Sequence, residues 1–111
     1  MTRRQATFTS DVLELGNVTL SKYTLELSTP KEKVRLSNKE YQIMEMLMRN
    51  PGNVIQIEQF LERIWGYDSD SEINVVWVNI SYLRKKLKSL EANIQIKATR
   101  NVGYTVEIID V

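Results

Sequence analysis

The sequence predicts an α+β fold in which a four-stranded antiparallel sheet is followed by three helices and a C-terminal β-hairpin. Three observations lead to this prediction. Apolar and polar residues alternate between residues 11 and 36, as in strands with one buried face. Three stretches between residues 37 and 90 repeat apolar residues at helical spacing. Two further alternating stretches flank a loop at residues 98–103.

Length and composition limit the classes of protein that the chain can belong to. Its 111 residues suffice for one domain with one core, which we expect at residues 11–111 after a leader or linker at 1–10. The absence of histidine and cysteine excludes disulfides, thiol chemistry, histidine-based metal sites and histidine acid–base catalysis. We therefore expect a non-enzyme with no cofactor, no metal and no catalytic residue. No apolar run could span a bilayer and no secretion signal is visible, so we expect a cytoplasmic protein without membrane contact.

The N-terminal part is predicted to form a small antiparallel meander. Its four strands are expected at residues 12–15, 18–21, 24–27 and 33–36. Short turn-forming stretches separate these strands. Alternation along each strand places the apolar residues on one buried face.

Three helices are predicted to follow. The first begins at Ser37, which forms an S-x-x-E capping box with Glu40, and it ends at an Asn-Pro-Gly sequence. The second covers about residues 57–65, where apolar residues recur at i, i+3, i+4, i+7 and i+8, and a glycine stops it. The third covers residues 72–90.

The third helix has one apolar stripe and an unusual opposite face. The stripe consists of Ile73, Val76, Ile80, Leu83, Leu87 and Leu90. The opposite face carries Asn74, Val78, Ser81, Tyr82 and Lys85. The middle of this face is uncharged and positive charge collects at its end, which suits contact with base edges and phosphates. An ordinary amphipathic helix with a basic C-terminus is the alternative. For Trp77, beside the stripe, we favour packing over contact with DNA or a partner.

Charge is distributed unevenly along the chain. The formal net charge is only +1, which by itself is no signature of nucleic-acid binding. Residues 79–105, however, hold six basic residues against one acid, and residues 58–72 hold five acids against one arginine. The basic segment could meet an anion, whereas the acidic segment could meet a basic protein surface or be solvated.

Three helices followed by a basic hairpin correspond to the winged-helix variant of the helix-turn-helix. Four motifs of the sequence resemble those of one family of this fold, the OmpR/PhoB-type DNA-binding domain. This domain is the effector half of two-component response regulators. The resemblance rests on LSNKEYQIMEMLMRNPGNVI, the IWGYD turn, V-x-V-x-I-x-x-L-R-K-K-L at 76–87 and IKATRNVGY at 96–104. It covers about residues 11–109 and implies sequence-specific binding of double-stranded DNA for transcriptional regulation in a phosphorelay.

The resemblance also implies roles for individual residues. Helix 72–90 would lie in the major groove and the wing at 96–108 on the minor groove. The candidate DNA-binding residues are Asn74, Val78, Ser81, Tyr82, Arg84, Lys85, Lys86, Lys97 and Arg100. Among them, Arg84 and Lys86 are expected to face the phosphate backbone, and Arg100 is expected to act from the wing. The acidic turn with Tyr67, Asp68 and Asp70 matches the loop through which activators of this family touch RNA polymerase; a solvated loop is the alternative.

The sequence departs from the family within the third helix. The family usually offers an arginine near position 74, an aspartate at 77, a histidine at 79 and arginines at 81 and 82. This chain has Asn74, Trp77, Asn79, Ser81 and Tyr82 at those positions. The target sequence therefore cannot be inherited from the family.

The family resemblance implies partners as well. It implies a domain that is monomeric when free and binds head to tail, as a dimer, on two direct-repeat half-sites of a promoter. The receiver domain is missing from this chain, so we expect an isolated effector half that starts in the interdomain linker; a stand-alone regulator is the alternative. A different class of function also remains open, a winged-helix protein-interaction module in which Val75, Val78 and Tyr82 form a partner-binding patch.

Overall fold

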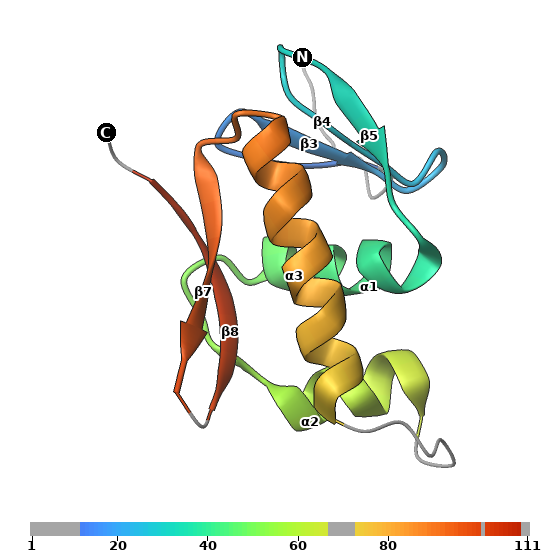
Figure 1. Ribbon diagram of the computed structural model, residues 1–111, viewed down its shortest axis with the longest axis vertical. Coiled ribbons are helices and arrows are strands. Elements are labelled where there is room, and N and C mark those ends of the chain that lie inside the picture. Colours follow the sequence, from blue (N-terminus) through green and yellow to red (C-terminus); the bar gives the residue numbers. More distant parts are fainter. Residues whose placement is uncertain (1–11, 67–72, 101, 110–111) are drawn as a thin grey trace, which may run out of the picture.

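The computed structural model describes residues 12–66, 73–100 and 102–109. It confirms the predicted order of a four-stranded antiparallel sheet, three helical segments and a C-terminal hairpin. The third helix lies in front of the first, the N-terminal sheet lies at one end of the molecule, and the hairpin runs beside the third helix (Figure 1). Within the described ranges, no helix has both the length and the apolar character that a membrane span requires.

The N-terminal sheet has strands in the order β2-β3-β4-β5. They are β2 (Val12–Leu15), β3 (Val18–Ser21), β4 (Glu26–Ser28) and β5 (Lys33–Arg35). Leu20 pairs with Leu27 across β3 and β4, and both side chains are buried. The third strand begins two residues later than alternation predicted, because Leu25 has a φ of 57° and its N–H donates to Ser21 O at 3.0 Å, which extends the turn.

Helix α1 (Asn38–Arg49) begins with the predicted capping box. Ser37 Oγ accepts from Glu40 N at 3.2 Å, and Glu40 Oε1 accepts from Ser37 N at 2.8 Å. The two interactions satisfy amide groups that have no partner inside the helix. The helix buries one face, formed by Tyr41, Ile43, Met44, Leu47 and Met48.

The second helix differs from the prediction of a regular α-helix. After β6 (Ile55–Gln56), α2 (Ile57–Phe60) continues as a π-helical turn, η1 (Leu61–Trp65), in which Gly66 N donates to Leu61 O at 2.8 Å. Lys39 Nζ, from α1, donates to Ile64 O at 2.9 Å and so satisfies a carbonyl near the helix end. Apolar spacing did not reveal the wider turn, because the buried residues Phe60 and Ile64 are four residues apart, as in an α-helix.

Helix α3 (Ile73–Ser89) buries the predicted stripe at Val76, Ile80, Leu83 and Leu87, and Leu90 continues the stripe just beyond it. The helix ends in a Schellman-like turn, in which Ala92 N donates to Leu87 O and Glu91 has a φ of 54°. Lys31 Nζ lies 2.6 Å from Glu91 Oε2, and this hydrogen bond, followed by Coulombic attraction, lowers the pKa of the exposed Glu91 carboxyl. The ion pair joins the end of α3 to the β4–β5 turn.

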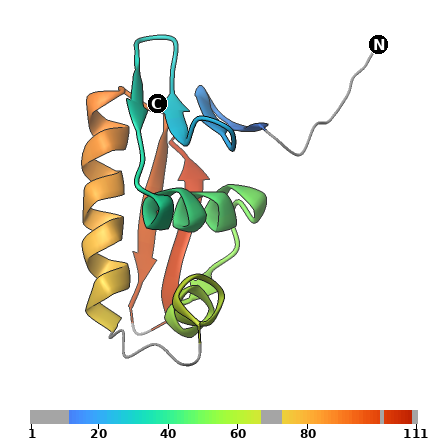
Figure 2. The same cartoon turned by 90° about the vertical axis from the view of Figure 1, so that its right-hand side faces the viewer.

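The C-terminal hairpin consists of β7 (Ile94–Thr99) and β8 (Gly103–Ile108), with β6 on the outer side of β8. The strands are longer and the connection tighter than predicted, since Ala98 pairs with Tyr104 and Thr99 with Gly103. Gly103 lies against β6 so closely that a Cβ atom there would be 1.9 Å from Ile55 O. In Figure 2 helix α3 stands beside the two strands, and α1 crosses in front of them.

Candidate nucleic-acid interface

One face of α3 is exposed and free of charged groups over its first three turns. It consists of Asn74, Trp77, Val78, Ser81 and Tyr82, at i, i+3, i+4, i+7 and i+8, so the five side chains adjoin one another. Trp77 is 58% exposed and Tyr82 is 50% exposed, whereas Val78 and Ser81 are half-buried. The exposure of Tyr82 agrees with the helix phase that the sequence predicted.

Trp77 corrects the sequence analysis, which favoured packing of the indole against the sheet, the wing or the stem of Arg84. Its side chain is among the most exposed large apolar groups in the described part of the chain. A signal for this position was present in the sequence, because the residues three before and four after it, Asn74 and Ser81, are both polar. Trp77 therefore joins the candidate interface.

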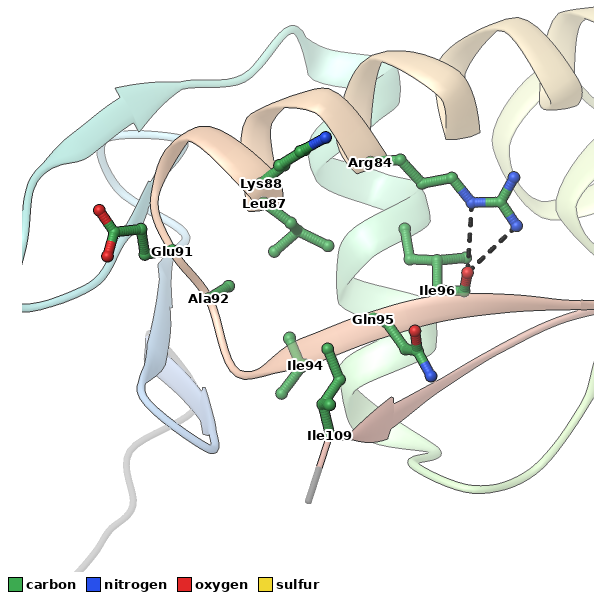
Figure 3. A pocket seen from close by; sticks show the side chains of 9 residues that line it. All are labelled: Arg84, Leu87, Lys88, Glu91, Ala92, Ile94, Gln95, Ile96 and Ile109. Atoms are coloured by element: carbon green, nitrogen blue, oxygen red, sulfur yellow. Dashed lines mark hydrogen bonds between the residues drawn. The ribbon is translucent and has the colours of Figure 1, made fainter. Parts of the chain in front are cut away.

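Arg84 links the long helix to the hairpin. Its Nε and Nη2 atoms donate to Ile96 O at 3.2 and 3.1 Å (Figure 3). The two bonds lie at one end of a groove of about 410 Å³, which is formed by the C-terminal half of α3, strand β7 and Ile109. Arg84, which was expected to face the phosphate backbone, thus also has an intramolecular role. Its guanidinium sets the spacing between α3 and β7.

Lys86 is directed into the fold. Its Nζ atom lies 2.6 Å from Glu40 Oε1 and also donates to Arg35 O at 3.2 Å. The Glu40 side chain is only 5% exposed, and the Lys86 side chain is 30% exposed. The expectation that Lys86 faces phosphates is therefore corrected, because its charge already neutralises the carboxylate that caps α1.

Besides Arg84, four basic residues of the segment 79–105 are exposed: Lys85 and Lys88 on α3, Lys97 on β7 and Arg100 at the tip of the hairpin. Lys88 was not among the candidates that the sequence named. Within the described residues, none of the four belongs to an ion pair. Lys85 follows Ser81 by one helical turn and so continues the uncharged face toward the C-terminus. The Arg84–Ile96 contact places the strand with Lys97 next to this helix.

The remaining positions that the sequence singled out are the loop residues before α3 and two asparagines on α3. Tyr67, Asp68 and Asp70, the expected polymerase-contact loop, lie outside the described residues. Asn74 is exposed at the first turn of α3. Asn79, which replaces a histidine of the family pattern, donates its amide to Val75 O at 2.7 Å and is engaged within the helix.

Comparisons with known proteins agree with this architecture. The family described as "Transcriptional regulatory protein, C terminal" matches residues 31–106. The transcriptional regulatory protein DltR of Streptococcus agalactiae is 41% identical over 106 residues, which cover 96% of this chain and 47% of that protein. The chain thus spans about half the length of the curated relatives it matches.

Two solved structures extend the similarity to the fold. The C-terminal domain of the nisin resistance regulator NsrR is similar with a TM-score of 0.74 and 32% identity, covering 88% of this chain and 99% of that one. The Klebsiella pneumoniae RstA DNA-binding domain, solved in complex with the RstA box, gives a TM-score of 0.72 at 27% identity, covering 86% and 96%.

Proposed function

The chain belongs to the family of C-terminal, OmpR/PhoB-type domains of transcriptional regulatory proteins, and from this premise we propose that it binds double-stranded DNA sequence-specifically to regulate transcription. One observation carries the proposal: an exposed helix face without charge adjoins exposed cations on the same helix and on the neighbouring hairpin. A groove in duplex DNA offers the complementary arrangement, with base edges between two rows of phosphates.

In the proposed complex, α3 lies in the major groove, which is wide enough to admit an α-helix. Asn74, Val78, Ser81 and Tyr82 meet base edges, and Lys85 and Lys88 meet phosphates. The hairpin lies on the minor-groove side, where Lys97 and Arg100 act. Arg84 holds the two elements in register, since its guanidinium bonds Ile96 O from α3.

We place this domain in a larger regulator. Because the relatives are about twice as long, the proposal includes a receiver domain in the full-length protein that controls the effector half through a phosphorelay. It also includes head-to-tail dimers on direct repeats, a polymerase contact through the loop with Asp68 and Asp70, and a cytoplasmic location, where a bacterial regulator meets DNA.

Salt dependence of duplex binding tests the proposal. Four exposed cations that each neutralise one phosphate would give a slope of about −3.6 in log K against log salt concentration. Lys85→Ala should reduce the steepness of this slope by about 0.9. Lys22→Ala is the matched control, because Lys22 is also exposed but lies in the β3–β4 turn of the N-terminal sheet. A flat salt response would refute duplex binding and favour the protein-interaction module.

The oligomeric arrangement needs a separate measurement. Sedimentation should find a monomer without DNA and two molecules on a selected duplex. The half-sites should be direct repeats about one helical turn apart, roughly 10 base pairs. A stable dimer without DNA, or a selected site with inverted repeats, would contradict the head-to-tail arrangement.

A further inference from the structure

The part of α3 that would read bases contains no charged side chain. In helix-turn-helix proteins the N-terminal residues of the recognition helix contact base edges. From Ile73 to Leu83 this helix has no arginine, lysine, aspartate or glutamate. The first cation is Arg84, whose guanidinium donates to Ile96 O. Arginine or lysine on O6 and N7 of guanine is the commonest specific contact in the major groove. The first three turns of α3 therefore lack the usual partner of a G·C pair.

The same three turns present side chains that suit A·T pairs. Asn74 is exposed, and an asparagine amide can bond N6 and N7 of adenine at the same time. Val78 lies four residues further on, in the middle of the face, and offers two methyl groups to the 5-methyl group of thymine. Trp77, 58% exposed, adds a broad apolar surface next to both. Ser81 and Tyr82 have hydroxyl groups that suit either kind of base pair.

We propose that α3 reads A·T pairs, with Asn74 on the adenine edge and Val78 and Trp77 packed on thymine methyl groups. This inference rests on the proposed function and specifies the chemistry of the half-site: A·T base pairs at the positions that the first three turns of α3 cover.

The cations beside this face of α3 favour duplex DNA over an apolar protein surface as its binding partner. A protein partner that covered Trp77, Val78 and Tyr82 would also have to cover or avoid the cations that continue the face. Lys85 and Lys88 lie on the following turns of α3, and Lys97 lies on the adjoining strand. A duplex supplies apolar methyl groups and phosphates together, so it matches both parts of the surface.

Replacing thymine by deoxyuridine tests the inference without altering the protein. Duplexes bound by the 111-residue chain are first selected from a random library, and thymines are then replaced one at a time in the selected duplex. Each replacement removes one methyl group and keeps the base pairing. At one or two positions the affinity should fall about fourfold, as expected for one methyl group removed from an apolar contact. Replacement of adenine by 7-deazaadenine should likewise weaken binding where Asn74 bonds N7.

Substitutions in the protein assign each effect to a side chain. In Val78→Ala or Trp77→Ala, the loss caused by deoxyuridine should shrink at the position that the side chain contacts, and in Asn74→Ala the effect of 7-deazaadenine should disappear. Trp77→Ala is informative even if Val78→Ala disturbs folding, because the indole is exposed. Val12→Ala is the matched control, since Val12 is 39% exposed on β2 and should leave every effect unchanged. In Figure 2, β2 and α3 lie on opposite sides of the molecule.

The outcomes separate the inference from the function on which it rests. Selected sites with G·C pairs under the first turns of α3, or affinities that no thymine methyl affects, would overturn A·T reading while salt-dependent binding still supported the proposed function. Failure to bind any duplex, even at low salt, would overturn both.

Discussion

Replacing Lys86 by methionine tests whether this lysine serves the fold or the DNA. The family resemblance implies a phosphate-facing residue, whereas the structure places Nζ 2.6 Å from Glu40 Oε1 and 3.2 Å from Arg35 O. Methionine keeps most of the aliphatic stem and a high helix propensity, so the substitution removes mainly the charge. The carboxylate of Glu40, 5% exposed, is then left without its cation.

The structure sets the size of the effect. Removing one partner of a fully buried ion pair costs about 3–5 kcal/mol, because the other charge is left uncompensated. Here Glu40 keeps the hydrogen bond from Ser37 N at 2.8 Å, and the 30% exposure of Lys86 indicates that water can approach. We therefore expect Lys86→Met to lower the free energy of unfolding by about 2–3 kcal/mol. Glu40→Gln keeps an oxygen for the capping box and should cost about 1 kcal/mol.

Urea unfolding followed by far-UV circular dichroism measures both variants and the double variant. The double variant should be destabilised by less than the sum of the two, with a coupling free energy of about 1–2 kcal/mol. In DNA binding, the salt slope of Lys86→Met should equal that of the parent chain under conditions where both are folded. A stability within about 0.5 kcal/mol of the parent, together with a slope reduced by about 0.9, would refute the internal role of Lys86.

Three further predictions concern the interface and the hairpin. Tyr82→Ala should leave the salt slope of DNA binding and the folding stability nearly unchanged. Competition among selected duplexes should show that discrimination at one or two base pairs falls by about 1–3 kcal/mol. Unfolding of this variant would contradict the exposed position of Tyr82. Arg100→Ala should weaken binding to all duplexes and reduce the salt slope by about 0.9 if the contact is to phosphate, and a change confined to one base pair would refute backbone contact. Gly103→Ala should lower the free energy of unfolding by about 2–3 kcal/mol, because the new Cβ would lie 1.9 Å from Ile55 O. At Gly52 nothing lies within 4 Å, so Gly52→Ala should cost only about 1 kcal/mol, which comes from its φ of 82°. Equal losses in the two variants would contradict the close approach of β6 and β8.

The exposed face of α3 shows how far a single helix can be derived from its sequence. Spacing alone predicted that Val76, Ile80 and Leu83 are buried and that Tyr82 points away from them, and the structure agrees. The prediction succeeded because each residue turns the helix by about 100°, so a stripe on one side defines the opposite side. Trp77 lies near the boundary between the two sides, where phase alone does not decide. Its polar neighbours Asn74 and Ser81 were the one sequence signal for its exposure.

Lys86 and Arg84 show what helical phase leaves open. Both are basic residues near the end of an amphipathic helix, and the family resemblance implied the same phosphate-facing role for both. The structure separates them, since Lys86 meets Glu40 of α1 and Arg84 meets Ile96 O of β7. These contacts bridge 46 and 12 residues of chain, and only the packing of α3 between two other elements brings the groups within reach.

The sequence by itself determined the fold class, the order of elements, the capping box at Ser37 and the buried stripe of α3, because these depend on local periodicity and on hydrogen bonds between near neighbours. Tertiary structure alone decided the π-helical turn at Leu61–Trp65, the pairing of β6 with β8 and the neutralisation of Lys86. The strand pairing and the Lys86–Glu40 contact join groups distant in sequence, and no local pattern records which groups will meet. The π-helical turn is local, but apolar spacing does not distinguish it from an α-helical turn.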